Sequence, residues 1–142
     1  MNTEANATNR SDDFVAYHST DIMGHELESG GPVKFLSRKS RHFLERAIGC
    51  NVWIITGTRD SSGHMIYRLV GRYTPSEIRD NPSDPDLHII YGEHEELLEP
   101  PLVLNDLDWF QELFREQNKF SYGFNQIRGE AILAGLNSAI QP

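Results

Sequence analysis

Five positively charged side chains gather in one short stretch of a chain whose formal net charge is -8. They are Lys34, Arg38, Lys39, Arg41 and Arg46. One acid, Glu45, lies among them, so residues 34–46 carry five positive charges minus one negative charge, or +4. Exposed cations at this density contact phosphate groups without regard to base sequence. The four cations after Lys34 therefore predict a phosphate-binding surface, with a merely solvated face as the alternative.

The acids are concentrated elsewhere in the chain. Residues 80–112 contain ten acids and neither Lys nor Arg. They are Asp80, Asp84, Asp86, Glu93, Glu95, Glu96, Glu99, Asp106, Asp108 and Glu112. We expect this acidic segment to lie away from the cations, where it would repel nucleic acid and orient its approach. The alternative is a protein-interaction or regulatory module whose acidic 80–112 surface docks a basic partner.

A second group of residues has the chemistry needed to hold a nucleobase. Stacking needs flat side chains, and the base edge needs a few polar groups. The candidates are Tyr17, His18, Ser19, Thr20, Trp53, Tyr122 and Asn125. The first four end a predicted strand where it opens into a long loop, a position that often carries binding residues. For Trp53 and Tyr122, packing in the core is the alternative interpretation.

Metal binding and catalysis find little support in the sequence. Cys50 is the only cysteine, which excludes an internal disulfide and a cysteine-rich zinc site. The histidines lack the spacing of zinc-binding helices or fingers, and no serine lies in a Gly-x-Ser-x-Gly elbow. We therefore assign no catalytic residue, metal or cofactor. A small hydrolase acting on nucleotides or RNA is the weakest alternative.

The elements that must position these residues follow from apolar periodicity. Strands are predicted at residues 14–18, 51–58, 65–74, 87–92, 100–104 and 118–127. In the third of these, Leu69 and Tyr73 are expected to point inward together. Residues 59–64 predict a hairpin connection. Three prolines in residues 74–86 predict a turn or a short helical corner.

Helices are predicted to cover the strands. They are residues 38–48 after a Ser37 cap, residues 106–116 after an Asn105 cap, and residues 128–140, with Gly135 as a weak point. The first is expected to bury Phe43 and Leu44 and to end at Gly49. Residues 1–12 are predicted to be a disordered leader and residues 13–142 a single domain. The predicted class is α+β, a small, mostly antiparallel β-barrel covered by two to three helices.

The order of these elements resembles the EVE-type branch of the PUA-like superfamily, which also includes the YTH, ASCH and SRA domains. The motifs that carry the resemblance are GCNVWIITG (49–57), YRLVGRYTP (67–75), PPLVLNDL (100–107) and KFSYGFNQI (119–127). It spans roughly residues 14–140 as a pattern of elements with loose motifs. The chain departs from the pattern in its acidic segment and in its first strand, where Tyr17 is followed by His18.

The resemblance implies a nucleic-acid-binding module, often one that tests a modified or flipped base in an aromatic-lined pocket. Its partner would be DNA or RNA, with or without a modified base, and a nuclease or another protein could accompany it. No apolar run approaches the roughly 20 residues of a membrane helix, and the N-terminus lacks the apolar centre of a signal peptide. We expect a cytoplasmic location, no membrane partner and no catalysis.

Overall fold

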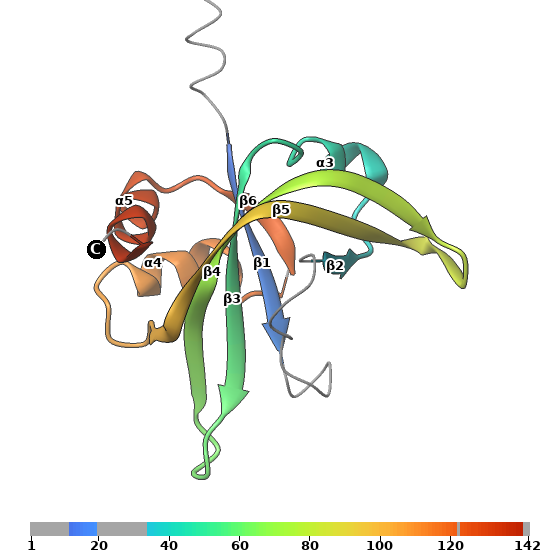
Figure 1. Cartoon of the computed structure of the whole chain (residues 1–142). Helices are drawn as coiled ribbons and strands as arrows, with labels where there is room; N and C mark the ends of the chain where they lie inside the picture. Colours follow the sequence, from blue (N-terminus) through green and yellow to red (C-terminus); the bar gives the residue numbers. More distant parts are fainter. Residues whose placement is uncertain (1–11, 20–33, 122, 141–142) are drawn as a thin grey trace, which may run out of the picture.

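The computed structural model describes residues 12–19, 34–121 and 123–140, except for the side chains of Ser19, Lys34, His94 and Glu95. Figure 1 shows how the described segments are arranged. The predicted leader, apart from Asp12, lies outside the described residues, as do Thr20 and Tyr122.

The centre of the molecule is one six-stranded sheet in the order β2-β5-β4-β3-β1-β6. The strands are β1 (Asp13–Ser19), β2 (Lys34–Ser37), β3 (Asn51–Arg59), β4 (Met65–Asn81), β5 (Asp84–Val103) and β6 (Phe124–Ile127). The helices are α3 (Arg41–Glu45), α4 (Phe110–Glu116) and α5 (Glu130–Ile140). β1 and β3 are parallel, and the other neighbours are antiparallel. The predicted α+β class and mostly antiparallel sheet are confirmed.

The sheet is open. Its outermost described strands, β2 and β6, are four residues long and each pairs on one side only. β4 and β5 are 17 and 20 residues long, and their pairing shifts register at several points. Such irregularities bend strands, and the β4–β5 pair curves strongly across the molecule (Figure 1). The bend does not bring the two edges together, so the sheet is curved but does not form the predicted β-barrel.

Both faces of the sheet are buried because β1 and β3 are apolar at successive positions. Phe14 and Val52 point to one face, and their neighbours Val15 and Trp53 point to the other. Alternate residues of a strand face opposite sides, so a continuous apolar run requires cover on both. One strand pair therefore builds two hydrophobic cores.

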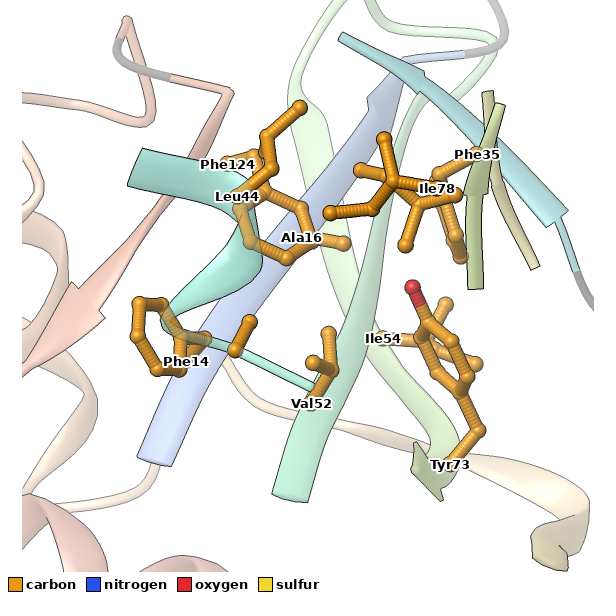
Figure 2. Close-up of a cluster of buried hydrophobic side chains, with 11 residues drawn as sticks. Phe14, Ala16, Phe35, Leu44, Val52, Ile54, Tyr73, Ile78 and Phe124 are labelled. Carbon is orange, nitrogen blue, oxygen red and sulfur yellow. The ribbon is translucent and has the colours of Figure 1, made fainter. Parts of the chain in front are cut away.

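Each core has its own cover. We call the core beneath α3 and β2 the first core; it gathers Phe14, Ala16, Phe35, Leu44, Ala47, Val52, Ile54, Tyr73, Ile78, Ile90 and Phe124. Figure 2 shows these side chains converging between β1, β3 and the α3 segment. The second core lies beneath α4 and α5; it gathers Val15, Trp53, Ile55, Leu69, Leu104, Phe110, Leu113, Phe120, Ile127, Ile132 and Leu136.

A register shift in β4 divides two residues that the sequence predicted on one face. Leu69 and Tyr73 are both fully buried, as expected, but Leu69 joins the second core and Tyr73 the first. Leu69 pairs with Ile55 and Gly71 pairs with Ile54, which leaves Val70 as an extra residue. One inserted residue moves every later side chain to the opposite face.

The proline-rich segment 74–86 is mostly strand, and the prediction of a turn or helical corner there is wrong. β4 continues through Pro75 to Asn81, and only residues 82 and 83 turn. Pro75 lacks an N–H, but it lies beside a register shift, where a missing donor is tolerated. Its carbonyl accepts the N–H of Gly49 at 3.0 Å. The strands predicted at 87–92 and 100–104 are parts of the single strand β5.

The first helix is shorter than predicted, because its cap lies three residues later. The Ser40 hydroxyl accepts the N–H of Phe43 at 3.2 Å and begins α3. Ser37 instead ends β2, a strand that the sequence did not predict. Leu44 is buried as expected, and Gly49 has a φ of +82°, the left-handed conformation that suits a glycine after a helix.

Two predicted boundaries in the C-terminal third are wrong, because a helix and a strand each begin later than predicted. α4 begins at Phe110, since the Asn105 side chain accepts from Tyr67 N and donates to Met65 O instead of capping a helix. The strand predicted at 118–127 is confined to β6. The terminal helix α5 is confirmed. No helix in the described part of the chain is long and apolar enough to cross a membrane.

Candidate functional site

Two of the four predicted phosphate-binding cations form ion pairs. Arg38 contacts Asp84 at 2.9 Å. Arg41 contacts Asp80 at 3.2 Å and Glu45 at 3.5 Å, and it donates to the Ile78 carbonyl at 3.0 Å. The β4–β5 hairpin brings these two aspartates to the α3 segment, so the acidic segment does not lie wholly apart from the basic one. The expected separation of charge is wrong at this end.

The other two cations surround an aromatic ring. Lys39 Nζ and the Arg46 guanidinium each lie 5.6 Å from the centre of the Phe43 ring. Arg46 also donates to Gln126 Oε1 at 2.8 Å. That amide is neutral, so Arg46 keeps its positive charge. The four predicted phosphate-binding cations therefore have different surroundings, with carboxylates at Arg38 and Arg41 and an aromatic ring at Lys39 and Arg46.

Trp53, a predicted base-stacking residue, is a core residue. Its side chain has 0% exposure, and its Nε1 donates to Asp13 Oδ2 at 2.8 Å. The Arg72 guanidinium lies 5.1 Å from the centre of the ring. Burial raises the pKa of Asp13, although the Trp53 hydrogen bond acts in the opposite direction. With both ring faces enclosed, the core-packing alternative holds for Trp53.

The remaining predicted base-binding residues are divided between the faces of the sheet. Tyr17 packs on the second core and is half-buried. His18, the next residue in β1, is buried and directed to the opposite face. Asn125 is half-buried on β6 opposite Val15, hence on the face of Tyr17. α3 packs on the first core, so the basic helix and Tyr17 lie on opposite faces of the sheet and cannot line one pocket together.

Tyr17 belongs to a group of five rings that we call the aromatic cluster. Its members are Tyr17, Tyr67, Phe110, Phe114 and Phe120. Tyr17 stacks on Phe120 with ring centres 4.8 Å apart and planes 3° apart. Phe110 and Phe120 are buried, whereas Tyr17, Tyr67 and Phe114 keep part of their surface exposed. Burial raises the pKa of the Tyr67 hydroxyl.

The turn after α4 holds Phe120 in this cluster by an uncommon backbone conformation. Asn118, Lys119 and Phe120 have φ values of 50°, 58° and 65°. Each non-glycine residue costs roughly 1–2 kcal/mol in the left-handed region, and such strain concentrates at functional sites. The turn buries Phe120 and leaves Asn118 and Lys119 at the surface. The buried Phe120 and the exposed Lys119 are thus successive residues of one strained turn.

Two surface depressions flank this end of α4. The smaller has a volume of about 170 Å³ and is lined by Gln111, Phe114, Arg115, Asn118 and Lys119. The larger has a volume of about 350 Å³ and is lined by Glu112, Arg115, Glu116, Gly129 and Ile132. Arg115 lines both. We call the two depressions together the α4 site.

The two cations of the α4 site, Arg115 and Lys119, share the site with the carboxylates of Glu112 and Glu116. Arg115 and Lys119 are exposed, and neither forms an ion pair within the described segments. The nearby Glu116 carboxylate is engaged elsewhere, because it accepts Gly129 N at 2.8 Å, Arg128 N at 3.1 Å and Gln117 Nε2 at 2.9 Å. The site therefore combines positive charge, a partly exposed Phe114 ring and the amides of its rim.

The sequence analysis missed this site, although a signal was present. Phe110 and Phe114 lie in the predicted helix 106–116, and Arg115 directly follows the second of them, with Lys119 four residues later in the turn after α4. Cations this close in sequence to a pair of phenylalanines were the signal, and the predicted sites did not include them. The strain in the turn could not be deduced from the sequence, because no glycine marks it.

Reactive chemistry is not apparent in the described part of the chain. Burial raises the pKa of the Cys50 thiol, whose Sγ lies 3.4 Å from the Arg46 carbonyl oxygen. A thiol of this kind is a poor nucleophile. No group of three or more His, Cys, Asp or Glu side chains is arranged to hold a metal ion among the described residues.

Comparison with models of protein families found no match, and a search of curated proteins found no similar chain.

Proposed function

We propose that this chain is a nucleic-acid-binding module that contacts a single strand at the α4 site. The observation that carries the proposal is the position of Arg115 and Lys119, which have no ion-pair partner among the described residues, around a depression with Phe114 in its wall. Proteins that bind single strands combine cations for the backbone with aromatic rings for the bases. The proposal agrees with the PUA-like resemblance of the sequence.

A single strand suits this site better than a duplex. A duplex presents phosphates at close intervals and is gripped by a broad basic surface, whereas this chain has a net charge of -8. Its stacked bases would also be out of reach of Phe114. A single strand can turn one base toward the ring and place one or two phosphates near the cations.

The predicted contacts near α3 become a secondary surface in this proposal. A phosphate at Arg38 or Arg41 would compete with Asp84 or Asp80. Lys39 and Arg46 both lie against the Phe43 ring, and Arg46 also donates to the neutral amide of Gln126. Recognition of a modified base stays a prediction. A base would have to contact Tyr17 from outside its stack with Phe120, since the two rings touch.

The test is binding to fluorescently labelled oligonucleotides, DNA and RNA, measured by anisotropy over a range of salt concentrations. Arg115→Ala and Lys119→Ala should each weaken binding about three- to tenfold. The double variant should reduce the slope of log K against log salt by about 1.4, because each phosphate contact on a single strand contributes about 0.7. Phe114→Leu should weaken binding by a similar factor without changing the slope.

Arg38→Ala is the matched control, because it removes one exposed cation on the opposite face. It should change affinity by less than about twofold. Equal losses for Arg38→Ala and Arg115→Ala would show that only overall charge matters, and the α4 site would be rejected. If the unaltered chain binds no oligonucleotide at low salt, the proposed function fails. The acidic segment 80–112 would then be the candidate, tested by capture of basic proteins from nuclease-treated lysate.

A further inference from the structure

We infer that the α4 site holds two successive nucleotides of one strand, with the phosphate that joins them at Arg115. The inference rests on the proposed function and specifies its ligand. Arg115 is the residue that the two depressions share. Two depressions that share one arginine match two bases that share one linking phosphate.

Arginine is suited to this position. Its planar guanidinium donates parallel hydrogen bonds to two oxygens of one phosphate. In the described structure the Arg115 side chain is exposed and forms no ion pair that a phosphate would have to displace. Its neighbour Glu116 is held by Gly129 N and Gln117 Nε2, and so is not available as an intramolecular partner.

The two depressions differ in chemistry, so they are expected to differ in the bases that they accept. The smaller offers the Phe114 ring and the side-chain amides of Gln111 and Asn118. Stacking on a ring tolerates every base. The larger is lined by the carboxylates of Glu112 and Glu116, and Ile132 in its lining is buried. Because a carboxylate only accepts hydrogen bonds, it favours a base with an exocyclic amino group, as Glu and Asp do with cytosine N4.

The inferred ligand of the α4 site is therefore a dinucleotide. Its base in the smaller depression can be of any kind, and its base in the larger depression carries an exocyclic amino group. Glu112 is exposed and has no cationic partner among the described side chains, so its oxygens can accept from a ligand. Its negative charge also explains why a second phosphate is not expected in the larger depression. The ligand is a short single strand, and its length and base content are the measurable consequences.

The experiment is competition against a labelled oligothymidylate about 12 nucleotides long. The competitors are thymidine monophosphate, the thymidine dinucleotide, the thymidine–cytidine dinucleotides in both orders, and a tetranucleotide. A dinucleotide should compete at about tenfold lower concentration than the mononucleotide, while the tetranucleotide should gain less than about threefold more. One of the two cytidine-containing orders should exceed the thymidine dinucleotide by about fivefold.

Two variants separate the parts of the inference. Arg115→Ala should abolish the advantage of dinucleotide over mononucleotide, and Arg115→Lys should restore only part of it, since an ammonium lacks the planar pair of donors. Glu112→Gln should keep the dinucleotide advantage and lower the preference for cytidine. Both residues are exposed, and unchanged circular dichroism would confirm that the variants fold.

The possible failures can be told apart. If the labelled oligothymidylate does not bind at all, the proposed function is lost. If it binds but mononucleotide and dinucleotide compete equally, or affinity climbs steadily with length, the two-nucleotide site is rejected while the function stands. A cytidine preference that Glu112→Gln leaves untouched would overturn the assignment of the amino-bearing base.

Discussion

Asp13 shows how a single residue can link the second core to pH. Its carboxylate accepts the Trp53 Nε1–H at 2.8 Å, and burial raises its pKa above the ordinary value of 3.8. Folding therefore favours the protonated acid. The stabilising effect of that proton is fully present below pH 3.8 and is lost as the pH rises through the higher folded pKa.

Asp13→Asn should remove this dependence, since the amide stays neutral and its oxygen still accepts the indole N–H. The free energy of unfolding of the variant minus that of the unaltered chain should become more positive as the pH rises above 3.8, and it should level off once Asp13 is deprotonated in the folded chain. Urea denaturation at several pH values measures it. Asp108→Asn, at an exposed aspartate, is the control and should show no such trend. A difference that shrinks with rising pH would contradict the raised pKa.

For individual residues, the sequence showed which side chains are capable of binding a ligand, but not which of them are already engaged in contacts within the fold. The sequence identified Tyr17 and the cations at 38 and 41 as capable of binding, and all three are at least partly exposed. It could not show that Arg38 and Arg41 meet acids more than 35 positions away along the chain. Ion pairs between residues far apart in the sequence depend on tertiary contacts, and the local sequence does not specify these contacts.

The packing of α4 against α5 depends on a close approach between elements. Gly135 lies under the indole ring of Trp109, and a Cβ at this position would overlap the ring. The sequence analysis interpreted Gly135 only as a weak point in a helix. The contact gives this glycine a packing role as well, because no other residue leaves room for the ring.

Gly135→Ala should therefore destabilise the protein by about 1–3 kcal/mol. In an exposed helix the same change would stabilise by roughly 0.5–1 kcal/mol, so the sign of the effect is the test. Thermal and urea denaturation provide the measurement. Ala134→Gly, at an exposed neighbour, should cost about 1 kcal/mol through helix propensity alone. Stabilisation by Gly135→Ala would mean that Trp109 moves aside without loss.

Helices and strands with a strong local sequence pattern were predicted well. Strands that form because they pair with a neighbouring strand were not. β1, β3, the hairpin between β3 and β4, and α5 follow from periodicity and turn residues. β2 is short and exists because it pairs with β5. The continuity of β4 through Pro75 also depends on its neighbours, since proline locally favours a break. The strained turn at the α4 site belongs to this second class.

At the scale of the whole molecule, β1 and β3 tie two cores into one unit. Ile54 is part of the first core and Ile55 of the second, although they are adjacent in β3. Both tryptophans pack with the second core. Tryptophan fluorescence therefore reports on one face of the sheet, while far-ultraviolet circular dichroism reports on all of its strands.

Ile54→Ala should lower the unfolding midpoint equally by both methods, with a loss of about 2–5 kcal/mol. The reason is that the strand cannot leave the first core while keeping its place in the second. Ile55→Ala is the matched variant in the second core and should behave in the same way. A lower midpoint by circular dichroism with an unchanged midpoint by fluorescence would show that the two faces unfold independently.

The place of β1 in the sheet has a consequence for synthesis on the ribosome. β1 is translated before every other strand of the sheet, yet it lies between β3 and β6, and Asp13 is opposite both Asn51 and Ile127. One edge of β1 can pair once β3 has emerged from the ribosome. The other edge cannot pair until β6, residues 124–127, has been synthesised. Until then an apolar segment with unsatisfied backbone groups stays open to neighbouring chains, and this nascent stage is where the protein is most exposed to aggregation.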